Sequence, residues 1–434
     1  MGGGTIIELP PSKTYGKTFA RHALILCIGL LSAFLSARAV ESNAAFGNDG
    51  IDRTDPNFVT ASLLVMGPEN ELYSCAGHSC IRLECPKFNL DYIFTYESER
   101  ISDKIFTFFM GKLKMGMFAI PTADYLKLGQ ESGRGVMQYR LNLPPDAKQR
   151  LWKLLDDRVA EGPCLPYDYM ERGCAQSAMT VLREALRPYE MTVNSWPEKY
   201  GRKSRHELLE MEIRETYPWQ MFILYTICGF TTDDGMSKFR KVCIPSDLHD
   251  ILCVAKVNGV PLIDGNGEEL ISRTRAKDTP PRFTPFIAAW ILVAIVIGNF
   301  FLRSLCMDWM FLTFQVVLGV FFFYMVLANL TAYRWHWLIV PFNLLPLVFW
   351  KWRKKWALGF AGVLLLWEIG MIAYPHRLTD PAYLVLVAAY VMMYARIGWP
   401  WRTAVMVGRD RRARRWSSVG HDDPIAPKGK RRAE

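Results

Sequence analysis

The chain has 434 residues, of which 50% are hydrophobic and 22% charged, and its formal net charge is +10 at pH 7. This length allows two or three domains. Much of the basic excess lies beside long apolar segments and in the C-terminal tail, which indicates contact with anionic lipid. The sequence contains no nucleic-acid-binding motif, so we expect no nucleic acid partner.

Residues 1–39 have the pattern of a secretory signal peptide. Basic residues precede the apolar run 22–35, which is followed by the small-x-small sequence Ala37-Arg38-Ala39. An apolar run of this length is short for a membrane helix but suits a signal peptide. We therefore expect a signal peptide or an N-terminal anchor, and export of the part that follows.

Residues 48–280 are expected to form an exported α+β domain with its own core. Short runs with β-branched residues or alternating polarity predict strands, and runs of good helix formers predict helices. The predicted strands are 59–66, 79–83, 92–96 and 136–143, and the predicted helices are 147–161, 174–186, 219–228 and 245–254.

Two short segments of this domain carry the residues of a nucleophilic site. Cys174 begins a predicted helix, where unpaired backbone N–H groups and the helix dipole favour thiolate over thiol. His78 lies at a predicted strand, so that its imidazole can take and return a proton. We expect Cys174 and His78 to form a catalytic dyad.

A catalytic Cys-His pair usually has a third polar group that orients the imidazole. Asp91, Thr95 and Tyr96 are the candidates from the following predicted strand. Because successive side chains of a strand point to opposite faces, the three cannot all face the site. The sequence leaves the choice among them open.

Three further side chains are candidates for contact with the oxyanion or the substrate. Tyr167 and Tyr169, shortly before Cys174, are candidate oxyanion donors or walls of a lipid site. Arg82 is a candidate partner for a lipid phosphate. The backbone N–H of Cys174 is an additional oxyanion donor.

Eight cysteines fall in the exported part, which allows disulfides but predicts no pairing. Cys75, His78, Cys80 and Cys85 are close in sequence, yet they lack the usual C-x-x-C pairing of a zinc site. We therefore expect no metal and no other cofactor.

The last third of the chain is expected to form a membrane domain of about five helices, over residues 285–399. The expected spans are 285–302, 309–329, 337–350, 357–374 and 382–399. Basic clusters at 351–355 and 402–415 belong in the cytoplasm by the positive-inside rule, and five crossings from an exported start place both there. Residues 402–434 are then a basic cytoplasmic tail.

Several segments of the exported domain are distinctive when taken together. They are Leu72-Tyr73-Ser74, Gly77-His78 with Arg82, 92–96, 109–112, Gly133-Arg134-Gly135, Leu141-Asn142-Leu143, 167–174 and 196–253. This combination, followed by membrane spans, resembles the thiol-dependent lipoprotein N-acyltransferase family of Bacteroides-type bacteria over most of the chain.

The resemblance implies a circularly permuted papain-like thiol fold, in which the histidine strand precedes the cysteine helix. His78 corresponds to the histidine of the family's Gly-His-x-x-x-Arg motif, and Cys174 to the cysteine of its Asn-Cys-Ser/Thr motif. Two positions differ, because Arg172-Gly173 stands where the family carries Asp-Asn, and Tyr96-Glu97 where it carries Tyr-Gly.

The resemblance also implies an activity and a location. An acyl chain would move from a phospholipid donor, through a thioester on Cys174, to the N-terminal diacylglyceryl-cysteine of a lipoprotein acceptor. We expect a multi-pass protein of the bacterial inner membrane with its thiol domain in the periplasm.

Two other functions fit the same residues. One is a membrane-tethered cysteine peptidase or amidase that acts on cell-wall peptides. The other is a membrane protein that keeps the thiol-enzyme fold for binding alone, which the altered Arg172-Gly173 sequence motivates. The membrane spans favour lipid chemistry, because they hold a cysteine at the bilayer surface where acyl esters are concentrated.

Overall fold

The computed structural model describes residues 58–98, 104, 107–108, 110, 112–168, 172–228, 236–263, 265–276, 278–327 and 336–399. The expected signal peptide or anchor, Tyr169 and the basic tail lie outside these residues. The chain divides into two compact units. The first holds the residues up to Thr216 together with Thr232–Thr279, and the second holds Tyr217–Thr231 and the chain from Pro280 onward.

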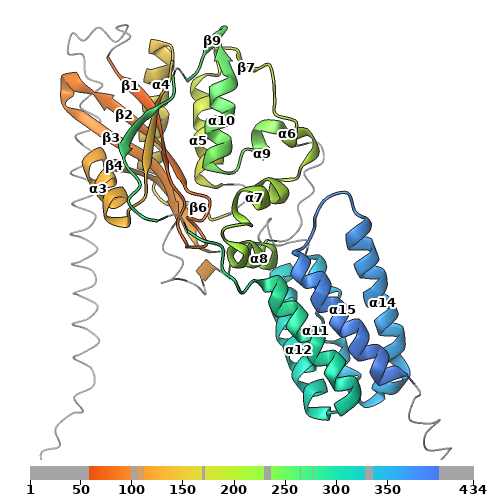
Figure 1. Cartoon of the computed structure of the whole chain (residues 1–434). Helices are drawn as coiled ribbons and strands as arrows, with labels where there is room; N and C mark the ends of the chain where they lie inside the picture. The colour runs from red at the N-terminus through yellow and green to blue at the C-terminus, as the bar shows by residue number, and fades with distance from the viewer. Residues whose placement is uncertain are drawn as a thin grey trace, which may run out of the picture. The chain divides into compact units, whose positions relative to one another are not determined.

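A seven-stranded antiparallel sheet forms the centre of the first unit (Figure 1). The strands lie in the order β10-β5-β1-β2-β3-β4-β6. Their bounds are β1 Thr60–Met66, β2 His78–Cys85, β3 Leu90–Ser98, β4 Lys114–Pro121, β5 Val136–Arg140, β6 Leu165–Pro166 and β10 Glu268–Ile271.

Helices cover both faces of this sheet. On one face α3 (Thr122–Ser132) places Tyr125 against Cys80 of β2. On the other face α4 (Pro145–Glu161) and α5 (Cys174–Ala185) pack on Ile81 and Leu83 of the same strand. Because successive side chains of a strand point to opposite faces, β2 contributes residues to the packing on both faces of the sheet.

The remaining elements of the first unit lie around this core. They are α6 Lys199–Arg202, α7 Arg205–Ile213, α9 Lys238–Lys241, α10 Pro245–Val254 and a small antiparallel sheet of β7 Met191–Val193, β8 Ala255–Val257 and β9 Val260–Pro261. The expected α+β class is confirmed.

The second unit is helical. It contains α8 Pro218–Ile227, α11 Pro285–Leu302, α12 Leu305–Leu327, α14 Arg353–Ala373 and α15 Pro381–Gly398. Within the described residues, four helices are long and apolar enough to cross a membrane, namely α11, α12, α14 with the turn before it, and α15. Large apolar side chains such as Trp290, Phe323 and Leu366 are exposed along them, as expected of a surface that faces lipid.

The segment 337–350, expected as a further span, is not a continuous helix. It contains a 3₁₀ helix Trp337–Ile339 and the short α13 Leu345–Val348, and a second 3₁₀ helix Trp350–Trp352 follows. Pro341 and Pro346 explain the breaks, because proline lacks an amide proton and disfavours helical geometry in the residue before it. The expectation of a fifth regular helix is corrected accordingly.

The broken segment still follows α12 along much of its length. The Phe342 ring lies 5.8 Å from that of Phe322, near the end of α12, and the Trp350 ring lies 5.2 Å from that of Trp309, near its beginning. Between them the buried Gln315 donates to a backbone carbonyl of the segment at 2.7 Å. The chain therefore passes through the bundle here in irregular form, with a buried amide to bind its free backbone.

Candidate active site

His78 is the first residue of β2, and its position is set by the glycine before it. Gly77 has φ +84°, and a Cβ atom at this residue would come within 2.7 Å of the Met66 carbonyl oxygen. Only glycine meets both demands without strain. The His78 side chain is buried, with 6% of the residue exposed.

Cys174 is the first residue of α5. Gly173 precedes it as the N-cap and offers no side chain to the free N–H groups of the first turn. The Cys174 thiol lies close enough to His78 and Ser79 for both residues to lower its pKa. The strand β2 and the helix α5 thus bring the two residues of the expected dyad together.

The electrostatics of this pair favour the thiolate and the imidazolium. Burial acts to raise the pKa of Cys174, but the His78 charge and the hydrogen bonds from His78 and Ser79 outweigh it and lower that pKa. Burial acts to lower the pKa of His78, but Cys174 and Glu97 raise it to about 9. The surroundings of the pair therefore shift both groups toward their charged forms.

A hydroxyl and a carboxylate lie behind the imidazole. The Nε2 atom of His78 is 2.6 Å from the Thr95 hydroxyl and 3.4 Å from a Glu97 carboxylate oxygen, and the Thr95 hydroxyl donates to Glu97 at 3.2 Å. With Nε2 so engaged, Nδ1 is the ring atom left for Cys174. Thr95 is fully buried, so this arrangement fixes the ring.

The other two candidates for the third residue lie elsewhere. Asp91 accepts two hydrogen bonds from Arg82, at 2.8 and 2.7 Å, and one from Thr122 at 2.5 Å. Tyr96 points to the opposite face of β3 from Thr95 and packs against the main core. Of the three candidates, only Thr95 is hydrogen-bonded to His78 in the part of the chain that the structure describes.

Of the three candidate substrate contacts, Arg82 and Tyr167 are described in contact with residues other than His78 and Cys174. Arg82 also donates to Gln138 at 2.7 Å, so its guanidinium belongs to a polar network that links residues of β2, β3 and β5. Tyr167 packs its ring 6.0 Å from that of Phe108 and donates its backbone N–H to Leu113. Tyr169 lies outside the described residues.

Two residues near the pair were missed in the sequence. Alternation along β3 places Glu97 on the face of Thr95, which is the signal that could have found it. Tyr73, in the loop between β1 and β2, is half-exposed and is electrostatically coupled to Cys174 and Glu97. Burial and then Glu97 raise the pKa of Tyr73 to about 12, so its hydroxyl stays a hydrogen-bond donor.

The described cysteines are all free thiols. Among the residues that the structure places, no group of three or more His, Cys, Asp or Glu side chains is arranged to hold a metal ion.

Residues 48–199 match the family model described as the Lnb N-terminal periplasmic domain. The matched stretch includes both His78 and Cys174. No curated protein and no solved structure matches the chain. The match and the four apolar helices fit a multi-pass membrane protein with a periplasmic domain.

Proposed function

We propose that this protein is a lipoprotein N-acyltransferase of the bacterial inner membrane, with a permuted papain-like thiol domain in the periplasm. The observation that supports the proposal is the Cys174 thiol beside the His78 imidazole, with shifts that favour their charged forms, in a chain whose described residues include four membrane-capable helices. The match of residues 48–199 to the Lnb N-terminal periplasmic domain also supports this proposal.

The first half of the reaction forms an acyl-enzyme. The Cys174 sulfur attacks an ester carbonyl of a phospholipid, and the backbone N–H groups at the start of α5 stabilise the oxyanion. The C–O bond then breaks, and the His78 imidazolium gives its proton to the departing glycerol oxygen. The products are a thioester on Cys174 and a lysophospholipid.

The second half transfers the acyl chain. The α-amine of an N-terminal diacylglyceryl-cysteine attacks the thioester, and neutral His78 takes the proton that the nitrogen loses. The C–S bond breaks, which leaves an amide on the lipoprotein and restores the thiolate beside the imidazolium. Thr95 and Glu97 stabilise the charged imidazole in both halves.

Trapping the acyl-enzyme tests this proposal. The full-length protein in detergent is incubated with phospholipid and no acceptor, and the peptide that contains Cys174 is weighed before and after hydroxylamine. We expect a gain of one acyl chain that hydroxylamine removes, absent in Cys174→Ala and retained in Cys253→Ala. A Cys174 peptide that never gains mass, with cleavage of cell-wall peptides instead, would favour the tethered peptidase or amidase.

A further inference from the structure

The loop 67–77 between β1 and β2 determines where His78 begins. Within the loop the backbone carbonyl of Ser74 accepts from the N–H groups of Glu69 and Gly77, at 3.1 and 2.9 Å. The loop also carries Tyr73. Its shape therefore places two side chains near Cys174.

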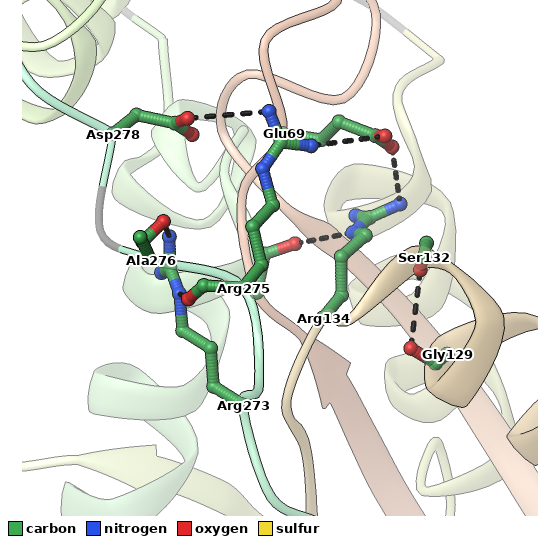
Figure 2. Close-up of polar contacts among 9 residues, drawn as sticks. Glu69, Gly129, Ser132, Arg134, Arg273, Arg275, Ala276 and Asp278 are labelled. Carbon is green, nitrogen blue, oxygen red and sulfur yellow. Dashed lines mark hydrogen bonds and ion pairs between the residues drawn. The ribbon is translucent and has the colours of Figure 1, made fainter.

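A buried arginine holds the beginning of this loop. Arg134 is 7% exposed, and it donates from Nε to the Gly67 carbonyl oxygen at 2.7 Å and pairs through Nη1 with Glu69 at 3.4 Å (Figure 2). Its charge is coupled to both Tyr73 and His78, so the guanidinium is close to the site.

A second arginine holds the same glutamate from the other side. Arg275 lies in a strap, which we define as residues 273–276 and 278, shortly before the second unit begins at Pro280. Its guanidinium pairs with Glu69 at 3.3 Å and with Asp278 at 3.2 Å, and it lies between the two carboxylates (Figure 2). The backbone N–H of Arg275 also donates to the Gly133 carbonyl oxygen at 3.0 Å, which fixes the strap beside Arg134.

We propose that Arg275 is a positioning residue for the Cys174–His78 pair. Arg275 forms an ion pair with Glu69. Glu69 and Arg134 in turn stabilise the loop 67–77, and this loop determines the position of His78 relative to the Cys174 thiol. The strap thereby couples the chain that enters the second unit to the reactivity of Cys174. This inference rests on the proposed function only in taking Cys174 and His78 as the reacting pair.

The pH profile of Cys174 alkylation measures this positioning without acyl transfer. Full-length protein in detergent is treated with iodoacetamide between pH 5 and 9, and the rate at Cys174 is followed by peptide mass spectrometry. In Arg275→Met we expect the rise of the rate with pH to move to higher pH and the rate at pH 6 to fall about two- to fivefold, the scale of a part-exposed ion pair. Arg275→Lys keeps a cation and should restore the profile.

Arg273 supplies a matched control in the same strap. Its guanidinium donates to the carbonyl oxygens of Arg275 and Ala276, both within the strap, so Arg273→Met should keep the wild-type profile. If Arg275→Met does not fold, Glu69→Gln removes the same contact from the loop side. An unchanged profile in the Arg275 or Glu69 variant, or an equal change in Arg273→Met, overturns the inference. Wild-type protein that transfers no acyl chain while the profile shifts as expected overturns the proposed function and leaves this inference standing.

Discussion

Cys174 and Cys253 are two thiols beside histidines, and their surroundings shift their pKa values in opposite directions. Cys253 lies 3.2 Å from the Nε2 atom of His249 on the exposed face of α10, and burial and Asp250 raise its pKa. His78 and Ser79 lower the pKa of Cys174 despite its burial. A neighbouring histidine alone therefore does not make a reactive cysteine.

We expect this difference to appear in alkylation of the wild-type protein. Cys174 should react with iodoacetamide at a lower pH than Cys253, because only its thiolate is stabilised. The pKa of His78 is raised to about 9, so the imidazole keeps its positive charge at lower pH, and this charge and its stabilisation of the thiolate are lost as pH rises through 9. Rates for each peptide between pH 5 and 10 check this, and equal profiles for the two thiols would contradict it.

Thr95 and Tyr96 provide a second residue-level comparison, since they are adjacent and face opposite sides of β3. Thr95→Val removes the hydroxyl that bonds to the His78 ring, which leaves the imidazole less well oriented and less stable when charged. A loss of one buried hydrogen bond predicts a fall of about tenfold or more in the transfer rate. Tyr96→Phe is the control and should keep the rate, and a Thr95 variant as active as that control argues against the role.

At the scale of single residues, the sequence shows which residue types can form the site but not which way their side chains point. Cys174 at a helix start and His78 at a strand are visible in it. The choice of Thr95 over Tyr96 depends on which face of β3 meets the imidazole, and this requires the register of β2 and β3. Glu97 was overlooked for the same reason.

Among the elements, the hairpin of β1 and β2 depends most on a single residue. Gly77→Ala introduces a Cβ within 2.7 Å of the Met66 carbonyl oxygen, at a positive φ that costs about 1–2 kcal/mol for an L-residue. We expect a lower unfolding temperature and slower alkylation of Cys174 at pH 7, because His78 is displaced.

Gly162 offers the control for this substitution. It also has a positive φ, of +64°, but a Cβ there would meet no atom within 4 Å. Gly162→Ala should therefore lose stability through its backbone alone and keep the alkylation rate of Cys174. Equal alkylation in the two variants would show that Gly77 does not position His78.

The elements with strong periodicity are visible in the sequence, and those without it are not. The predicted strands 59–66, 79–83 and 92–96 correspond to β1, β2 and β3, and the helix starting at Cys174 to α5. The strand β4 and the helix α3 were missed, because β4 contains Gly116 and α3 contains Gly129, with the proline Pro121 between them. Their formation depends on packing against the sheet, which a local pattern does not record.

At the scale of the whole molecule, the irregular passage at 337–350 matters for topology. With four regular helices and this passage, the chain runs through the bundle five times. The basic cluster 351–355 then lies at the same end as the C-terminal end of α15, where Arg396 pairs with Asp308 near the beginning of α12. The positive-inside rule assigns this end to the cytoplasm.

A reporter fused after Glu434 tests the sidedness. We expect a green fluorescent protein fused there to fold and fluoresce, and an alkaline phosphatase at the same position to be inactive, because the positive-inside rule predicts a cytoplasmic C-terminus. An alkaline phosphatase fusion in the loop between α14 and α15 should be active. The opposite pattern would mean that the chain crosses the membrane an even number of times.

Transfer of an acyl chain to an amine is the central claim, and mass spectrometry of a diacylated lipopeptide measures it directly. Full-length protein in detergent is incubated with the lipopeptide and phospholipid, with Cys174→Ala and Cys253→Ala in parallel. We predict a gain of one acyl chain on the α-amine with wild type and Cys253→Ala, and none with Cys174→Ala. An unmodified lipopeptide in all three reactions, or equal modification by Cys174→Ala, would contradict the proposed function.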